Sequence, residues 1–566
     1  MNTLYLGDCL NVLRESIPDE SVDLVYIDPP FNSKRDYNIF FDDKEIQTQR
    51  IAFEDTWTLK NIQDSLAELH TLKTDNLYFL LLTYQKVAPH AFPYLTMMSL
   101  RILELHRVLK PTGSFYLHCD PTMSHYLKTA CDIIFNVRNY RNEIIWKRTS
   151  AHNDPNQFGR NADRILFYSK SDNYKFNPIF LEYDEEYLKK FYRFKDDGGI
   201  YRLSDLTGAG ITKGESSQSW KGYNPTEKGR HWAIPTWAVE KFCNKKEIDA
   251  LSSVDKLDLL HKNGLIEISK NGVPSFKRYL EEMEGAPAQE IWVDIPPISP
   301  QAKEKLGYPT QKPKALLERI IKASSNEGDT VLDGFCGCGT TVDAAESLHR
   351  KWIGIDISPI AISLIKRRLK DTYEEGLNKF EVRGTPTDEQ SAIALWRQNP
   401  NAFQDWWLTE FEVFSTTFGT KGADKGIDGI AQYLRNPYNV ASTKAKKQKG
   451  GSTFAGEEGV IRAAFQVKGG INIQSKDIDA LLGAIDKHKC ELGVFLTIAE
   501  PTKPMLETIA GAGFVEIAGS NIPRLQILTL EDYFKNKKLK LPSVNITFKA
   551  AQLKGKSRQN QFKLEM

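Results

Sequence analysis

The stretch that most restricts the fold of this chain is residues 22–31, where a short apolar segment runs directly into two consecutive prolines. The apolar part is rich in β-branched residues, which predicts a buried strand. Neither Pro29 nor Pro30 can donate a hydrogen bond to a neighbouring strand, so the strand must end at Asp28. The Asp28 carboxylate, main-chain carbonyl oxygens and the ring of Phe31 are then left at the edge where open α/β sheets bind their ligands. Such oxygens can accept hydrogen bonds from an exocyclic amine and such a ring can stack on a flat base, while an ordinary turn is the alternative.

Strands and helices alternate around this stretch. Residues 3–6 and 114–118 have the composition of short buried strands, and residues 94–109 carry apolar side chains at helical spacing. Further strands are expected at residues 143–147 and 164–168. This alternation is typical of a wound α/β sheet, which is the fold class that we predict.

A glycine-rich turn lies between two further predicted strands, residues 329–333 and 352–356. Glycines let the backbone approach a ligand closely, and the amino terminus of the following helix offers free N–H groups. Asp356 lies 23 residues after Asp333, at the end of the next strand, where nucleoside-binding sheets place a carboxylate for the ribose. The pattern predicts a nucleoside-containing cofactor, and it lacks the lysine of a triphosphate-binding loop. The turn consists of Gly334, Phe335, Cys336, Gly337, Cys338, Gly339 and Thr340.

Composition and charge exclude several classes of protein and of binding site. With 566 residues the chain can hold several domains, and its net charge of +2 means that any nucleic-acid surface must be a local patch. The seven cysteines form no Cys-x-x-Cys pair, which argues against a disulfide framework and a zinc ribbon. We interpret Cys336 and Cys338 as small packing residues. No basic and apolar leader and no apolar run of membrane-spanning length is present, so we expect a cytoplasmic protein without a membrane partner.

Between residues 151 and 300 the periodicity weakens, and aromatic residues mix with Lys, Arg, Gly and Pro. Basic residues among aromatics suit a groove that follows phosphates and contacts bases. We therefore favour DNA contact for this region, and the alternative is an irregular insertion with its own small core. The aromatic residues concerned are Tyr201, Trp220, Tyr223, Trp232, Trp237 and Trp292.

Over roughly residues 1–380 the chain resembles the β-type amino-methylating DNA methyltransferases, including the modification subunits of type III restriction systems. The order carries the resemblance, because Asp28-Pro29-Pro30-Phe31 comes first, a variable region follows and the glycine turn comes last. Gly334 stands where the family usually has proline, and Cys338 where it usually has serine. Further matching segments are residues 7–8, 53–57, 109–114, 143–146, 310–313 and 316–319.

The resemblance implies an S-adenosylmethionine-dependent methyltransferase with a Rossmann-like sheet that acts on double-stranded DNA. It implies a catalytic half over residues 1–150, an inserted target-recognition region over 151–300 and a cofactor-binding half over 301–385. Methyl transfer to a base amine requires the base to leave the duplex, because its amine is otherwise paired.

The resemblance also implies roles for single residues. Phe31 would stack on the base, and Asp28 and the Pro29 carbonyl would accept its amino hydrogens. Asp rather than Ser before the two prolines favours the N6 amine of adenine over the N4 amine of cytosine. For the cofactor, Asp8 would contact the adenine end, the backbone of residues 335–339 the amino-acid end, and Asp356 the ribose.

The last third of the chain carries a second pattern. Asp428 and the pair Gln466 and Lys468 lie near two predicted strands that can form a hairpin, so the three can meet at one end of it. Asp428 could hold a divalent cation and Lys468 could stabilise charge, whereas an exposed alternating strand is the alternative.

Residues of about 400–534 resemble the Mrr-type restriction-endonuclease-like domain, with Gln-x-Lys in place of the usual Glu-x-Lys. The resemblance implies a second α/β domain over residues 400–545, followed by a basic tail over 546–566. It implies Mg²⁺ bound by Asp428 and by a helix acid. Asp405 is our assignment for that acid, with Glu410 and Glu412 as alternatives.

Three function classes follow from these patterns. The first is a bifunctional enzyme of a restriction-modification system that methylates adenine and cleaves DNA lacking the mark. The second is an active methylase whose last domain only binds DNA. The third, a non-enzymatic DNA-binding regulator, is disfavoured because Asp28 and Asp356 occupy positions suited to chemistry and to a cofactor. The sequence leaves open whether the chain is a monomer or a homodimer.

Overall fold

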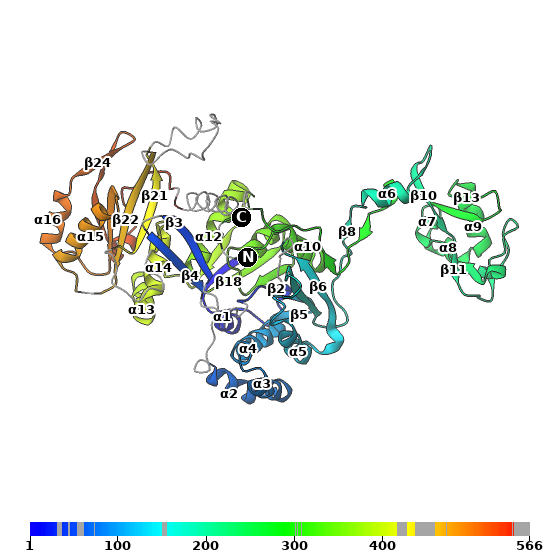
Figure 1. Ribbon diagram of the computed structural model, residues 1–566, viewed down its shortest axis with the longest axis horizontal. Coiled ribbons are helices and arrows are strands. Elements are labelled where there is room, and N and C mark those ends of the chain that lie inside the picture. Colours follow the sequence, from blue (N-terminus) through cyan, green and yellow to red (C-terminus); the bar gives the residue numbers. More distant parts are fainter. Residues whose placement is uncertain are drawn as a thin grey trace. The chain divides into compact units, whose positions relative to one another are not determined.

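The larger of two compact units, Met1–Asn177 with Glu290–Met566, contains a nine-stranded mixed sheet (Figure 1). The computed structural model describes residues 1–30, 37–43, 46–53, 62–72, 74–149, 156–299, 302, 304–306, 308, 310–415, 427–435, 459–470, 472–545 and 547. For β3 (Tyr37–Asp43) and β4 (Ile46–Phe53), an antiparallel pair, it describes the backbone alone.

The strand order of the main sheet is β16-β6-β7-β5-β2-β17-β18-β1-β19. Neighbours from β5 to β19 are parallel, whereas β7 runs antiparallel to both β5 and β6. Its strands are β1 (Asn2–Leu6), β2 (Val22–Ile27), β5 (Leu109–Cys119), β6 (Tyr140–Lys147), β7 (Ala162–Ser169), β16 (Ile291–Trp292), β17 (Thr330–Asp333), β18 (Lys351–Asp356) and β19 (Phe380–Arg383).

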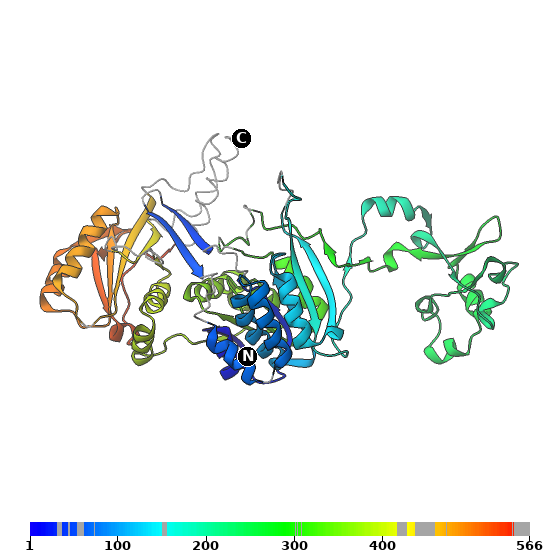
Figure 2. The same ribbon diagram turned by 60° about the horizontal axis from the view of Figure 1, so that its bottom comes forward.

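Helices cover both faces of this sheet, as Figures 1 and 2 show. Successive side chains of a strand point to opposite faces. Accordingly, Val25 and Ile27 join one apolar core while Leu24 and Tyr26 join the other. Two covered faces explain why β2 is apolar along its length instead of alternating with polar residues. The helices of the first core are α1 (Cys9–Ser16), α2 (Gln63–Thr71), α3 (Asp75–Val87), α4 (Phe92–Val108) and α5 (Ser124–Phe135), and those of the second are α10 (Lys314–Ser324), α11 (Thr340–Ser347) and α12 (Pro359–Tyr373).

Strand β2 pairs directly with β17, although about three hundred residues separate them. Val331 lies opposite Leu24 and Leu332 opposite Val25 in a parallel register. The segment after β2 and the glycine turn after β17 therefore leave neighbouring strands at the same edge of the sheet. The predicted α/β class with a large sheet is confirmed.

The second compact unit spans Pro178–Gln289 and has its own core. Four strands form a sheet of order β13-β14-β10-β9. The unit is shorter than the predicted region 151–300, because β7 and β16 belong to the main sheet. Its elements are β8 (Phe180–Leu181), α6 (Glu185–Phe191), β9 (Phe194–Asp196), β10 (Gly199–Asp205), β11 (Thr207–Ala209), β12 (Arg230–Trp232), α7 (Thr236–Val239), α8 (Lys245–Ala250), α9 (Ser253–Lys262), β13 (Ile266–Ile268), β14 (Pro274–Tyr279) and β15 (Ala286–Pro287).

The last third of the chain forms a five-stranded sheet of order β20-β21-β22-β23-β26 (Figure 1). The first three strands are antiparallel, and β22, β23 and β26 are parallel. Apolar cores lie on its two faces. The elements are α13 (Glu389–Gln398), α14 (Pro400–Glu410), β20 (Phe414–Ser415), β21 (Gly429–Leu434), β22 (Val460–Lys468), α15 (Ser475–Lys487), β23 (Leu492–Thr497), α16 (Lys503–Gly511), β24 (Phe514–Ile517), β25 (Ser520–Pro523), β26 (Leu525–Thr529) and α17 (Leu530–Phe534).

Among the helices that the structure describes, none has the length and apolar character needed to cross a membrane. The predicted basic tail over residues 546–566 lies outside the described residues except for Thr547.

Candidate functional site

The carboxyl end of β2 presents Asp28, as the two prolines require. The strand ends at Ile27, Asp28 is the next residue, and Pro29 is buried behind it. Pro30 is half-buried. Phe31 lies outside the described residues, so its stacking role stays a prediction.

The two oxygens of the Asp28 carboxylate have different surroundings. Oδ2 accepts a hydrogen bond from the ammonium of Lys312 in an ion pair whose side chains are 16% and 9% exposed. Oδ1 is buried and accepts no hydrogen bond from any residue that the structure describes. One acceptor atom of Asp28 is therefore committed to the protein and one is left for a ligand.

Lys312 is a site residue that our sequence analysis did not single out. Its segment, residues 310–313, entered only as part of a family resemblance. The two partners are 284 residues apart in sequence. No local spacing rule connects residues at that separation, so the pair could not be read from the sequence.

Asp333 closes β17 and holds the glycine turn in place. Its Oδ1 accepts from the Phe335 N–H at 3.0 Å and its Oδ2 from the Thr341 hydroxyl at 2.5 Å. Burial raises the pKa of this carboxyl from 3.8 to about 7, although both hydrogen bonds favour the ionised form, and the nearby Asp28 and Asp356 raise it further. The side chain that we predicted to bind a cofactor thus also shapes the turn.

Asp356 ties the end of β18 to the same turn. Its Oδ2 accepts from the Gly337 N–H and its Oδ1 from the Ser358 N–H, each at 2.8 Å. Burial raises its pKa from 3.8 to about 6, against the effect of these two bonds. The next residue, Ile357, is 63% exposed and offers an apolar surface at this edge.

Asp8 lies near Asp356, but both of its carboxylate oxygens already accept hydrogen bonds from other residues of the chain. Leu6 is paired with Asp356 across β1 and β18, which places Asp8 at the predicted edge. Its Oδ1 caps α1 by accepting from the Leu10 N–H at 2.9 Å, and its Oδ2 accepts from Arg101 at 2.6 Å. A cap and a half-buried ion pair therefore account for both oxygens of Asp8.

At two positions of the turn, neighbouring side chains leave no room for a Cβ atom, so only glycine fits. A Cβ at Gly334 would lie 2.7 Å from the Cys9 sulfur, and one at Gly339 would lie 2.6 Å from the Ile365 side chain. Gly339 also has a φ of +74°, a conformation that L-residues other than glycine rarely adopt. Gly334, where the resembling family has proline, is thus matched to a cysteine on the neighbouring helix.

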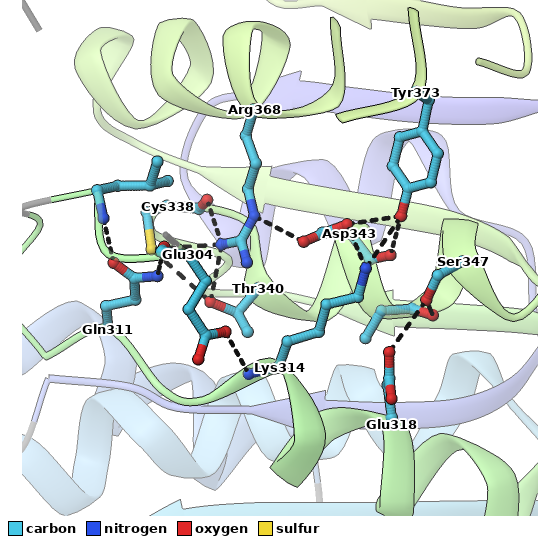
Figure 3. A network of polar contacts seen from close by, with 12 residues as sticks. Glu304, Gln311, Lys314, Glu318, Cys338, Thr340, Asp343, Ser347, Arg368 and Tyr373 are labelled. Carbon is cyan, nitrogen blue, oxygen red and sulfur yellow. Dashed lines mark hydrogen bonds and ion pairs between the residues drawn. The ribbon is translucent and has the colours of Figure 1, made fainter. Parts of the chain in front are cut away.

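The rest of the turn joins a network of buried charges and hydroxyls (Figure 3). The guanidinium of Arg368 donates to the Cys338 carbonyl at 3.3 Å, to the Thr340 hydroxyl at 3.1 Å and to Asp343 at 2.9 Å. Burial opposes the ionisation of Asp343, but Arg368 and Lys314 outweigh it and hold its pKa below the usual value. The Thr340 side chain, predicted to bind cofactor, is therefore engaged in the interior.

Cys336 and Cys338 are both buried, at 5% and 4% exposure. Burial raises the pKa of both thiols, so they stay protonated near neutral pH. Cys336 packs in the core between the sheet and α10, α11 and α12. These contacts agree with the interpretation of the two cysteines as packing residues.

The aromatic residues of the predicted DNA-contact region are core residues. Tyr201, Trp220 and Trp232 are 6%, 3% and 4% exposed, and Tyr223 and Trp237 pack against the same core. Trp292, 7% exposed, belongs instead to the main sheet. The four buried rings are therefore not available to contact bases, and the region has its own core, as the alternative held. DNA contact by this region stays a prediction. Mixed aromatic and basic composition did not distinguish the two, because a small core also needs large apolar side chains.

In the last third, Asp428 and Gln466 meet at one end of the β21–β22 hairpin. Asp428 precedes β21, and its Oδ2 accepts from the Val467 N–H at 2.7 Å. Gln466 is 7% exposed, and its Oε1 has no hydrogen-bond partner among the described residues. Lys468 follows on the same strand and lies 3.8 Å from Asp477. The structure thus brings the first two predicted residues together, with Lys468 at the strand end beside them.

The predicted Mg²⁺ site is not assembled by these residues. In the described part of the chain no three His, Cys, Asp or Glu side chains gather where they could hold a metal ion. Asp405 is buried on α14, in a helix whose aromatic residues form the core on one face of the sheet. Among the described residues, one carboxylate and one amide oxygen are too few to hold a metal ion, so Mg²⁺ binding by Asp428 and Asp405 stays a prediction.

Comparison with known proteins matches the larger part of the chain to methylases. A family model described as DNA methylase matches residues 22–367. The Type II methyltransferase M.EcaI of Enterobacter cloacae is 33% identical over 276 residues, which cover 49% of this chain and 57% of that protein. The type III restriction-modification enzyme StyLTI Mod subunit of Salmonella typhimurium is 27% identical over 365 residues, covering 62% of this chain and 50% of that protein.

A third relative, the DNA adenine methyltransferase YhdJ of Escherichia coli, is 24% identical over 369 residues, covering 65% of this chain and 82% of that protein. The chain spans about half the length of the first two relatives. The residues matched by the family model include Asp28, Lys312, the glycine turn and Asp356, and they make up more than half of the chain. The chain therefore belongs to the N6/N4 DNA methylase family.

Proposed function

We propose that this chain transfers a methyl group from S-adenosylmethionine to the N6 amine of adenine in double-stranded DNA. The observation that carries the proposal is the buried Oδ1 of Asp28, which has no hydrogen-bond partner among the described residues and directly follows β2, the strand next to β17 and its glycine turn. A carboxylate oxygen without a protein donor is suited to accept an amino hydrogen of a base. The name of the relative YhdJ, a DNA adenine methyltransferase, favours adenine over cytosine.

The residues at this edge suit a cofactor that carries a positive charge. Asp28 and Asp356 are carboxyls close enough to Asp333 to raise its pKa. Neither Asp333 nor Asp356 is bonded to a cationic side chain among the described residues. When bound, S-adenosylmethionine supplies an electrophilic methyl group on a positively charged sulfur.

The neutral parts of the cofactor also find matching groups. Each oxygen of Asp356 accepts one N–H and keeps capacity for a ribose hydroxyl. The exposed Ile357 can cover one face of an adenine ring, and the backbone of residues 335–339 can meet the amino-acid end.

The target base must leave the duplex, and Asp28 then holds its amine. S-adenosylmethionine held by Asp356 and the backbone of residues 335–339 would supply the methyl group, and the amine held by Asp28 would take it up and release one proton to water. Hydrogen bonds from the amine to Asp28 Oδ1 and to the Pro29 carbonyl direct the nitrogen lone pair toward the methyl carbon. Holding two reactants in alignment in this way can account for about 7–11 kcal/mol of a reaction barrier.

Methyl transfer from radiolabelled S-adenosylmethionine to plasmid DNA tests the proposal. Wild type should transfer label, and Asp28→Ala should abolish transfer while calorimetry still detects cofactor binding. Transfer that persists in Asp28→Ala would sink the assignment of Asp28. Digestion of the labelled DNA to nucleosides identifies N6-methyladenine or, as the alternative, N4-methylcytosine.

We infer that the protein belongs to a restriction-modification system in the cytoplasm, as the names of its type II and type III relatives suggest. The unit Pro178–Gln289 interrupts the methylase sheet in sequence and has its own core, which suits an inserted target-recognition region. Its exposed Lys and Arg side chains, not its aromatic rings, are the candidates for contact with phosphates.

A second candidate function is DNA cleavage by the last domain. The buried Oε1 of Gln466 without a partner, next to Asp428, favours it, because buried polar atoms are normally bonded. Plasmid incubated with the protein, with and without Mg²⁺, tests this function. Cleavage that is lost in both Asp428→Ala and Lys468→Ala supports a nuclease. Retained DNA binding without cleavage supports a binding module.

A further inference from the structure

Lys312 is held in a defined position beneath the candidate reaction centre. It precedes Pro313, the N-cap residue of α10, and the buried face of that helix packs in the core of the main sheet. The neighbouring side chain of Gln311 accepts from the Leu306 N–H at 2.8 Å and donates to the Glu304 carbonyl at 2.6 Å. These contacts, drawn in part in Figure 3, fix the backbone from which Lys312 extends.

The ammonium of Lys312 is bonded to one oxygen of one carboxyl at this edge. It donates to Asp28 Oδ2 and, at 3.3 Å, to the Thr310 carbonyl. Lys312 is 8% exposed, so the pair is largely withdrawn from water. A lysine at this depth needs a partner to stay charged, and a carboxylate at this depth equally needs a cation.

Other titratable groups near Asp28 do not supply that cation. Lys312 also acts on the buried carboxyl of Asp163, which is bonded to His118. The groups whose ionisation Asp28 affects are Asp333, Tyr26 and Tyr308. None of these three carries a positive charge, so none can balance the charge of Asp28. Lys312 is the cation that the structure bonds to Asp28.

We propose that Lys312 is a positioning residue for methyl transfer, holding Oδ2 of Asp28 so that the carboxylate offers Oδ1 alone to the target amine. This inference rests on the proposed function. An ionised carboxylate accepts a hydrogen bond from the amine, whereas a protonated one presents an O–H that competes with it. Fixing one oxygen also removes rotation of the carboxylate as a source of misalignment.

Substitutions of Lys312 separate this role from a purely structural one. Lys312→Met keeps most of the side chain's length without the charge, and Lys312→Arg keeps the charge. The matched control is Lys175→Gln, which breaks a lysine pair to Asp23 and Asp329 elsewhere in the same sheet unit. Melting temperature and the Kd for S-adenosylmethionine show whether each variant is folded and binds cofactor.

The deciding measurement is the single-turnover methylation rate from pH 5 to pH 9, with saturating DNA and cofactor. Lys312→Met should lose at least tenfold in rate at pH 7, and the acid limb of its profile should move up by one pH unit or more. Lys312→Arg should keep the wild-type acid limb, as should Lys175→Gln.

A Lys312→Met profile that superimposes on the wild-type profile, or that drops equally at every pH, would overturn the role. If Lys312→Met does not fold, the Lys312→Arg profile decides. Arginine keeps the positive charge, so a lower rate together with an acid limb at higher pH in this variant would contradict the proposed role. Wild type that transfers no methyl group would refute the proposed function itself, whereas active wild type with an unshifted variant refutes only the role of Lys312.

Discussion

Replacing Asp333 with Asn should stabilise the protein at alkaline pH and weaken its hold on a cationic cofactor. Asp333 is 3% exposed, and burial raises its pKa from 3.8 to about 7. The Asn oxygen can still accept from the Phe335 N–H, and its amide can donate to the Thr341 hydroxyl. The substitution therefore keeps the turn and removes a buried negative charge.

The size of the effect follows from linkage. The folded state keeps a proton on Asp333 up to about pH 7, whereas the unfolded chain loses it near pH 3.8. Because the folded pKa is raised, this contribution to stability is complete below pH 3.8 and disappears as pH rises through 7. Its slope is about 1.4 kcal/mol per pH unit, so wild type loses about 3 kcal/mol between pH 5 and pH 8. Asp333→Asn has no such loss.

Thermal melts at pH 5 and pH 8 measure this difference. The melting temperature of Asp333→Asn relative to wild type should rise by several degrees from pH 5 to pH 8, at about 2 °C per kcal/mol. The matched control is Asp343→Asn, whose parent carboxyl has a lowered pKa because Arg368 and Lys314 outweigh burial. That variant should be destabilised equally at both pH values. Identical pH dependence in wild type and Asp333→Asn would refute a raised pKa as the source of instability.

Two further predictions concern the sheet edge that carries the glycine turn, where we propose that the cofactor binds. Affinity for S-adenosylmethionine should increase from pH 5.5 to pH 7.5, because a cation favours the ionised forms of Asp333 and Asp356, whose pKa values are about 7 and about 6. Calorimetry at pH 6 in two buffers of different ionisation enthalpy should detect released protons, and a buffer-independent enthalpy would contradict this. Gly334→Ala should cost about 1–3 kcal/mol of stability by overpacking against Cys9. Cys9→Ala should restore most of that loss in the double variant, and additive losses would show that the two residues are not coupled.

Local sequence patterns predicted the strand ends and turns that are determined by residues adjacent in the chain. Two prolines after an apolar run fixed the end of β2 within one residue, and glycines between two strands marked the turn that follows β17. Both are backbone constraints set by residues adjacent in the chain. For the same reason the order of strand, turn and helix at residues 330–347 could be expected.

What the sequence could not reveal depends on residues brought together by the fold. The partner of Asp28 is 284 residues away, and the neighbour that excludes a side chain at Gly334 is on α1. The burial of Tyr201, Trp220 and Trp232 could not be foreseen, because composition alone does not say whether a ring is buried or exposed. Likewise, the contacts of Asp8 with Arg101 and of Thr340 with Arg368 join residues distant in sequence and could not be foreseen.

The three carboxyls at this edge differ in one respect that matches their proposed roles. Asp28 alone is bonded to a cationic side chain, and it is the group that must be ionised to accept an amine hydrogen. Asp333 and Asp356 are bonded only by N–H and O–H groups, so burial leaves their pKa values raised. A lysine beside either of them would lower that pKa and also repel a positively charged cofactor. Under the proposed function, the carboxyl paired with a lysine would hold the base amine, and the two carboxyls bonded to no cationic side chain among the described residues would face the positively charged cofactor.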